Sequence, residues 1–412
     1  MIEFSTHTLN NGLRLVHHRD YTSRFAVVNV LYNVGSKYEN PERTGLAHLF
    51  EHLMFGGSKN IPDYDTPLQI AGGRSNAWTS NDLTNYYDIL PVQNLETALW
   101  LESDRMRELA FTTESLEVQR KVVIEEFKET TLNVPYGDAY GMMLKNLYVK
   151  HPYRWPVIGK EVSHIEKVTM DEVKEFFYSH YLPSNAIISI VGNISFEDTL
   201  KLVEKWFGDI PAGTPDIHVL ERDPLIGDKK MLKLSGDVPQ RVIYKYYRME
   251  ERFGADYIPS DIITDILSGG RSSRFSQHVI LKGRGFSTLD ASVWGVLDPG
   301  LLFVRGRLLS GVDFEEADYI IQSELDEIIK GNISKYEIDK CVNKSESLFL
   351  LENYAQEDLA WKLAYYAKSG DVNKINTEYD NYRKVTAEDI QCVANSVFCE
   401  NASATLHYDC NI

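Results

Sequence analysis

The sequence has few cysteines and no long apolar run. Its 4 cysteines, among 412 residues, form no CxxC pair and have no histidine at zinc-finger spacing, so we expect reduced thiols and no zinc finger. No segment approaches the roughly 18 to 20 apolar residues that cross a bilayer, which excludes a transmembrane helix. Met1 to Asn11 lacks a basic start followed by an apolar stretch, so no signal peptide is expected in the chain as given.

Positive charge is also in deficit. The 43 Lys and Arg against 60 Asp and Glu leave a formal net charge of −17, which repels phosphate backbones and anionic lipid. We therefore expect neither a nucleic-acid nor a membrane partner. The cytoplasm is the default location, and the periplasm is the alternative if a signal peptide has been removed.

Phosphate-binding loops are missing as well. Gly72-Gly73 and the stretch from Gly269 to Arg274 are glycine-bearing, but no Lys-Ser/Thr follows either of them at Walker spacing. Both are interpreted as turns. A nucleotide-dependent transferase is therefore disfavoured.

The chain is long enough for two domains. Its 43% apolar and 25% charged residues are typical of a globular protein. The stretch from Lys167 to Val173 is echoed by the stretch from Lys384 to Ile390, which indicates two halves of similar plan. Residues 209–230 are rich in Pro and Gly and have no clear period, so we predict domains at 1–208 and 231–412 joined by a linker at 209–230.

One predicted helix, about Thr44 to Met54, carries the motif His-x-x-Glu-His. His48 and His52 lie one turn apart on the same face, with Glu51 beside them. Two histidines at this spacing can hold zinc, and a neighbouring carboxylate can act as general base. The opposite face is apolar, as in a helix that packs on a core. A bare match to this motif also arises by chance, as two surface histidines with a glutamate.

A second predicted helix, about Thr113 to Thr130, offers candidates for a third ligand in Glu125, Glu126 and Glu129. Glu126 flanks the apolar Val123, whereas Glu125 falls on the outer side. The helical phase favours Glu126. A solvated surface remains the alternative, since Glu-rich helices are usually exposed.

The sequence resembles the pitrilysin and insulysin family of peptidases, which also includes the mitochondrial processing peptidase. His48-x-x-Glu51-His52 resembles the family's metal and base motif, and Gln119 to Glu126 resembles the helix with its third ligand. The resemblance implies two α+β domains of similar fold, each an antiparallel-dominated sheet packed with helices. It also implies one Zn²⁺ per chain, held by His48, His52 and Glu126. Gln119 stands where many members have a supporting Glu beside the metal.

The segment from Ser75 to Ser80 resembles the family's substrate strand, where a peptide adds as a further strand. Asn76, Ala77 and Thr79 are its candidate substrate-binding residues. An ordinary hairpin is the alternative. The function implied is a zinc metalloendopeptidase that hydrolyses short or extended peptides, with Glu51 activating a zinc-bound water.

The sequence departs from the family in its second half. Active members usually carry an Arg and a Tyr, seven residues apart, that help hold substrate; Leu281 and Thr288 occupy those positions. We therefore expect a dimer, specifically a heterodimer in which a paralogous subunit supplies the Arg and Tyr. A homodimer that tolerates the loss is the second possibility, and a non-catalytic assembly subunit is the main rival function.

Overall fold

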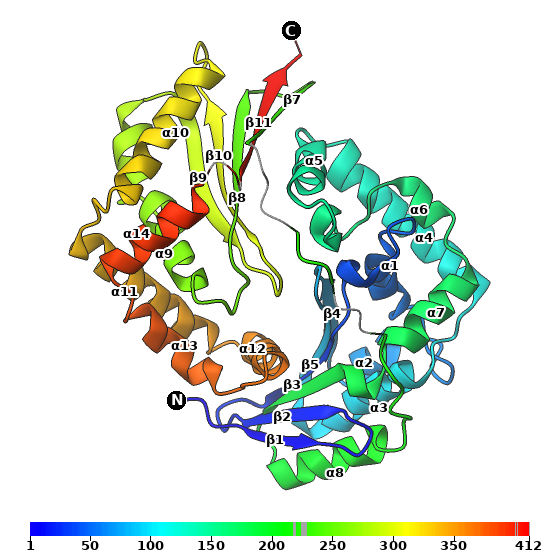
Figure 1. Cartoon of the computed structure of the whole chain (residues 1–412). Helices are drawn as coiled ribbons and strands as arrows, with labels where there is room; N and C mark the ends of the chain where they lie inside the picture. The colour runs from blue at the N-terminus through cyan, green and yellow to red at the C-terminus, as the bar shows by residue number, and fades with distance from the viewer. Residues whose placement is uncertain (217–219, 224–228, 400, 402, 412) are drawn as a thin grey trace. The chain divides into compact units, whose positions relative to one another are not determined.

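Two mixed sheets of matching strand order organise the chain (Figure 1). Within each sheet every neighbouring pair is antiparallel except one, β2–β6 in the first and β7–β11 in the second. The predicted α+β class, with two similar antiparallel-dominated sheets, is confirmed. The first sheet runs β1 (Ser5–Thr8), β2 (Arg14–Arg19), β6 (Ala186–Gly192), β3 (Phe25–Tyr32), β5 (Thr84–Pro91), β4 (Arg74–Thr79), and the second runs β7 (Lys230–Gly236), β11 (Ser403–Cys410), β8 (Val242–Arg248), β10 (Leu301–Leu308), β9 (Phe286–Trp294).

The internal echo in the sequence marks two equivalent helix starts. Thr169 accepts from the backbone N–H of Glu172, and the Glu172 carboxylate accepts from the backbone of Thr169; Thr386 and Asp389 form the same capping box. Each capping box starts a helix that comes directly before a strand or is separated from it by a short turn: α7 before β6 in the first sheet and α14 before β11 in the second. The helices are α1 (Leu46–Leu53), α2 (Asp65–Ile70), α3 (Leu95–Arg107), α4 (Thr113–Phe127), α5 (Gly137–Leu147), α6 (Val162–Glu166), α7 (Met170–His180), α8 (Phe196–Phe207), α9 (Tyr257–Ser268), α10 (Phe314–Ile329), α11 (Lys335–Glu352), α12 (Gln356–Lys368), α13 (Lys374–Tyr382) and α14 (Ala387–Val397).

The computed structural model describes all residues except 217–219, 224–228, 400, 402 and 412. Part of the predicted linker, 209–230, thus lies outside the described residues. The described chain forms two compact units that interleave in sequence. The first unit comprises Met1–Lys128, Trp155–Leu220 and Leu350–Thr377, and the second comprises Glu129–Arg154, Glu221–Phe349 and Glu378–Ile412. The prediction of two continuous domains did not anticipate that residues 129–154 belong to the second unit and residues 350–377 to the first.

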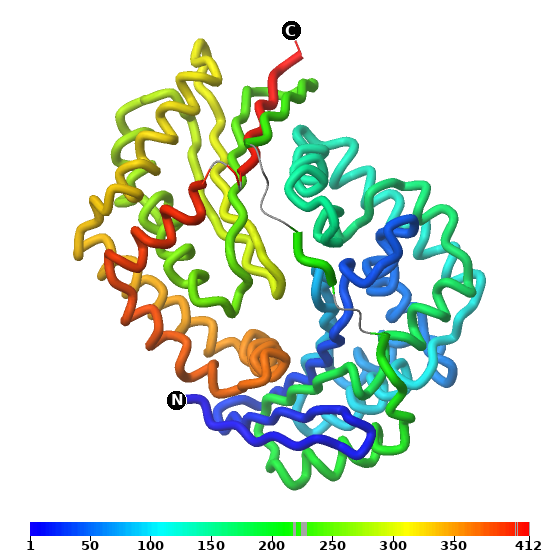
Figure 2. The backbone as a smooth tube through the Cα atoms, in the orientation of Figure 1, coloured from blue at the N-terminus to red at the C-terminus, as the bar shows by residue number. Residues whose placement is uncertain are grey.

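Helices cover both faces of the first sheet. Helices α1, α3 and α8 contact one face, and α12, drawn in orange in Figure 2, contacts β2, β3, β5 and β6. Strand β6 shows the consequence, since Ile188 joins the apolar core that includes side chains of α1, whereas the Ser189 hydroxyl donates to the Ala360 carbonyl of α12 at 2.6 Å. Because both faces are covered, all seven residues of β6 are buried.

The second unit has two apolar clusters. One gathers α9, α10 and α14 with strands β8 to β10, around side chains such as Ile243 and Val304. The other packs α5, which comes from the first half of the chain, against Val242, Leu406 and Tyr408. Among the described residues, no helix is long and apolar enough to cross a membrane.

Candidate metal centre

Helix α1 is fixed at its N-terminus by a residue upstream of it. Gly45, with φ 90°, precedes the helix and has no side chain to cap it. A Cβ there would meet the Ile158 carbonyl oxygen at 2.7 Å, so glycine is required. The buried Glu39 carboxylate caps the helix instead, accepting from the backbone N–H of Gly45 at 3.0 Å and of Ala47 at 2.8 Å. It also accepts from the Trp155 indole at 3.1 Å.

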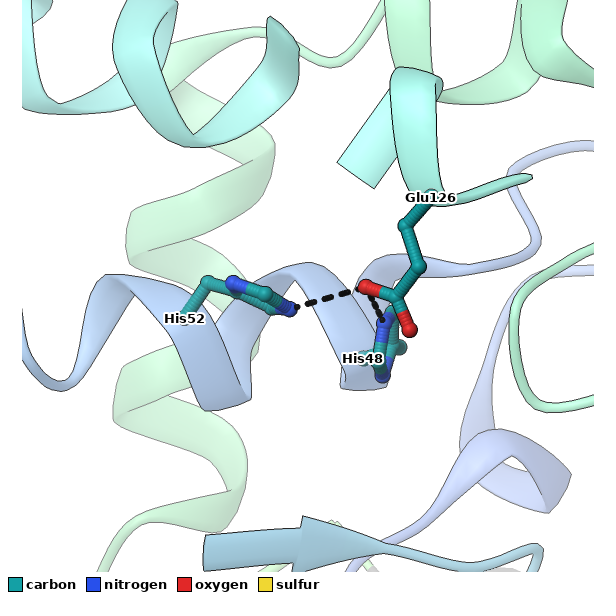
Figure 3. Close-up of side chains that lie close together, drawn as sticks. All are labelled: His48, His52 and Glu126. Carbon is teal, nitrogen blue, oxygen red and sulfur yellow. Dashed lines mark hydrogen bonds and ion pairs between the residues drawn. The ribbon is translucent and has the colours of Figure 1, made fainter. Parts of the chain in front are cut away.

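The two histidines of α1 meet one glutamate of α4 (Figure 3). Glu126 Oε2 lies 3.1 Å from His48 Nε2 and 3.4 Å from His52 Nε2. One ligand atom from each residue lies within 4.8 Å of the others. All three side chains are partly buried, with 14%, 25% and 38% exposed for His48, His52 and Glu126.

These separations suit a tetrahedral ion. Two ligand atoms each about 2.1 Å from a tetrahedral centre lie about 3.4 Å apart, close to the distances of 3.1 and 3.4 Å from Glu126 to the two histidines. Two imidazoles and one carboxylate also match the donor set of catalytic zinc, which leaves a fourth position open. The residues present therefore fit a zinc ion.

Packing of α4 selects Glu126 rather than its neighbour. Val123 and Phe127 are buried in the unit, which turns Glu126 toward α1. Glu125 is 65% exposed and forms an ion pair with Lys128 at 2.7 Å. The structure thus brings Glu126 together with His48 and His52, as the helical phase predicts.

Glu51 lies beside this group with its orientation fixed. Its Oε2 accepts a 2.6 Å hydrogen bond from the Thr79 hydroxyl of β4 and lies 3.7 Å from His48 Nδ1. Burial raises the pKa of Glu51, but the contacts with His48 and Thr79 outweigh burial and lower it overall. The carboxylate therefore stays ionised at neutral pH and is able to accept a proton.

The two histidines differ electrostatically. Burial lowers the pKa of His48, but Glu51 and Glu126 outweigh it and raise this pKa above its ordinary value. The pKa of His52 falls, chiefly through burial and the neighbouring His48. Both carboxylates thus favour positive charge at this site, whether from a proton or from a metal ion.

The predicted substrate residues lie on the free edge of the first sheet. β4 is the last strand in the sheet order and pairs on one side with β5. The Ala77 N–H donates to the Asn76 side chain at 2.9 Å. Gln119 is half-buried on α4, and no hydrogen bond joins it to the three candidate ligands in the described part of the chain. Its supporting role stays a prediction.

Two contacts were missed at the sequence level. Thr79 was expected only to bind substrate, yet it holds Glu51. Glu39 was not singled out, although a helix that starts at Gly45 without a capping side chain signals that another acceptor is needed.

Comparison with known proteins matches most of the chain to two family models. Residues 14–158 match the model described as Insulinase (Peptidase family M16), and residues 167–345 match the model described as Peptidase M16 inactive domain. The chain is 28% identical to the zinc protease PqqE of Helicobacter pylori over 97% of this chain and 91% of that protein. It is 25% identical to the mitochondrial-processing peptidase subunit beta of Caenorhabditis elegans over 50% of this chain and 45% of that protein.

A solved structure agrees with these matches. The crystal structure of a protease from Helicobacter pylori superposes with a TM-score of 0.92 and 26% identity, covering 99% of this chain and all of that one.

Proposed function

This chain belongs to the M16 family of peptidases, and from that premise we propose that it is a zinc-dependent endopeptidase acting on extended peptides. One observation carries the proposal: His48, His52 and Glu126 place a ligand atom each within 4.8 Å of one another. Glu51 stands beside them as the general base.

His48, His52 and Glu126 would hold one Zn²⁺ per chain. When bound, zinc polarises the scissile carbonyl and lowers the pKa of water at its open position. The chain's own contribution is to keep the three ligands on packed helices, so that little reorganisation is needed on binding. Among the described residues, no fourth histidine, cysteine or carboxylate joins this group. The fourth coordination position is therefore left for substrate and water.

Glu51 would move the proton. Its ionised carboxylate accepts a proton from the attacking water and delivers it to the departing amine. The Thr79 hydroxyl, which donates to Oε2 at 2.6 Å, keeps the carboxylate from turning away. Thr79 thus acts as a positioning residue for the base, while also lying on the strand proposed to bind substrate.

The substrate would bind along β4. An extended peptide can add antiparallel to this edge through main-chain hydrogen bonds, which recognise backbone rather than side chains. Binding would take the Ala77 N–H from the Asn76 side chain, which accepts it at 2.9 Å in this structure. Short or unfolded peptides are therefore the proposed substrate class, because a folded chain has no free backbone to offer.

A second candidate is a subunit that cleaves only with a paralogous partner. Leu281 is 68% exposed and Thr288 is exposed on β9, and neither offers a guanidinium or phenol to a substrate. Two comparisons favour this candidate: residues 167–345 match an inactive-domain model, and half of the chain matches a relative named as a subunit. A non-catalytic assembly role is disfavoured by the intact ligand group.

Zinc content and peptide cleavage, measured on the same preparation, test the proposal. We expect one zinc per chain by metal analysis, and cleavage of a quenched fluorescent peptide that a chelator stops and added zinc restores. Cleavage that appears only on adding a paralogous subunit would establish the second candidate. A chain that binds no zinc would overturn both.

A further inference from the structure

The second unit contains a cavity of about 320 Å³, whereas the proposed zinc ligands belong to the first unit. It lies between α5 and the face of β8 and β10 that α5 partly covers. Its lining is mainly aromatic, with two arginines, and consists of Pro135, Tyr136, Ala139, Tyr140, Val242, Tyr244, Tyr246, Phe303, Arg305 and Arg307. All of these residues belong to the second unit.

Strand pairing places the arginines against the tyrosines. Arg305 pairs with Tyr244 across β10 and β8, and Phe303 pairs with Tyr246. Residues two apart on a strand share a face, so Arg307 extends the same row. Tyr246 stacks on Phe303 at 5.5 Å and on Tyr244 at 6.3 Å between ring centroids. The result is an aromatic floor with two guanidinium groups at one end.

Several polar groups of this cavity lack partners. Tyr244 and Tyr246 are only 9% and 6% exposed, and within the described ranges neither hydroxyl makes a hydrogen bond. No ion pair involves Arg307 in the described part of the chain. Arg305 has one, to Asp290 at 3.6 Å, and both side chains are about half exposed. Neither hydroxyl is among the described side-chain oxygens that are both fully buried and unpartnered, so both reach the open space of the cavity and are available to a ligand.

The chemistry favours one class of ligand. Guanidinium and phenol groups all donate hydrogen bonds, and paired arginines suit a carboxylate. A free phosphate would satisfy the donors but leave the aromatic floor uncovered, whereas a terminal amino-acid residue has both a carboxylate and a side chain. The volume is near the lower end for ligand sites, which fits one residue rather than a passing strand.

We propose that this cavity binds the C-terminal residue of a peptide. The carboxylate contacts Arg305, Arg307 and the two hydroxyls, and the side chain lies on Tyr246 and Phe303. The choice of a peptide as ligand rests on the proposed function, but binding requires neither zinc nor turnover.

The test uses the full-length Glu51→Gln chain, freed of metal with a chelator. A short peptide that ends in phenylalanine and is labelled at its N-terminus is titrated by fluorescence anisotropy, as the free acid and as the C-terminal amide. We expect the acid to bind at least about 10-fold more tightly, since each factor of ten is about 1.4 kcal/mol and charged hydrogen bonds supply that much. Equal affinities would overturn the proposal.

Variants locate the contact. Arg307→Gln or Arg305→Gln should reduce the preference for the acid to under about 3-fold, and Tyr244→Phe should weaken acid binding about 3- to 10-fold. Arg271→Gln, an exposed arginine of the same unit outside the cavity, is the matched control and should change nothing. Two results would overturn the assignment. One is a preference for the acid that persists in both arginine variants. The other is displacement of the labelled peptide by inorganic phosphate as effectively as by the unlabelled peptide acid. Because metal and turnover are absent, either outcome is independent of whether the chain is a peptidase.

Discussion

Glu39→Gln should reveal how helix α1, which carries two of the candidate metal ligands, is held at its N-terminus. The substitution keeps the shape of the side chain but turns one acceptor oxygen into a donor. Glu39 is 5% exposed and accepts three hydrogen bonds, from Gly45, Ala47 and Trp155. Glutamine loses least when its amide NH2 replaces Oε1, which accepts only from Ala47. The amide oxygen then replaces Oε2 and keeps the hydrogen bonds from Gly45 and Trp155.

The size and pH dependence of the effect follow from these contacts. One buried donor left unsatisfied costs about 1 to 3 kcal/mol. Burial raises the pKa of Glu39 from 4.5 to about 8, and the three donors offset this only in part. Between these values the folded chain holds a proton that the unfolded chain releases, so wild-type stability falls as pH rises, by up to about 1.4 kcal/mol per pH unit. Glutamine does not titrate. The cost of Glu39→Gln is therefore largest near pH 5, and by pH 8 the variant is as stable as the wild type or more stable.

Urea unfolding of the metal-free proteins at a series of pH values checks this. The difference between variant and wild type isolates Glu39, because all other titrating groups are shared. Glu42→Gln, an exposed glutamate three residues on, is the control and should show no such trend. If the stability difference between wild type and variant instead stayed constant from pH 5 to pH 8, Glu39 would be ionised throughout and the reasoning refuted.

Three other changes follow from the structure. Glu126→Gln should weaken zinc binding far more than Glu125→Gln, because only Glu126 lies against the histidines; equal losses in a metal titration would contradict the ligand assignment. Thr79→Val should lower kcat about 10-fold with zinc affinity unchanged and Thr79→Ser should restore it, whereas an unaltered rate in the Val variant would refute the positioning role. A fragment of residues 1–208 should be largely insoluble, because it lacks α12 and exposes one face of its sheet; a soluble fragment with a cooperative urea transition would show that the sheet does not need this helix.

The proximity of the three candidate ligands was predictable because its geometry is local. Helical spacing alone puts His48 and His52 on one face, and the burial of Val123 settles the phase that places Glu126. The contact between Thr79 and Glu51 was not predictable, since it depends on how β4 packs against α1. Packing of a strand against a helix produces no residue pattern in either segment that identifies the contacting pair.

The fold shows the same division. The similar segments at Thr169 and Thr386 revealed the repeat, because a capping box is formed by residues only three positions apart in the sequence. The assignment of α5 to the second unit and of α12 to the first could not be predicted. Each is an amphipathic helix whose sequence does not specify which sheet it covers.

Zinc content and cleavage rate in the Glu51→Gln variant test the central claim most directly. The comparison uses whichever preparation of the wild type cleaves peptide, alone or with a partner. We predict that the variant retains one zinc per chain and loses roughly 10²- to 10⁴-fold in rate, because the base is removed while His48, His52 and Glu126 remain. A zinc-loaded variant that cleaves at nearly the wild-type rate would contradict the account.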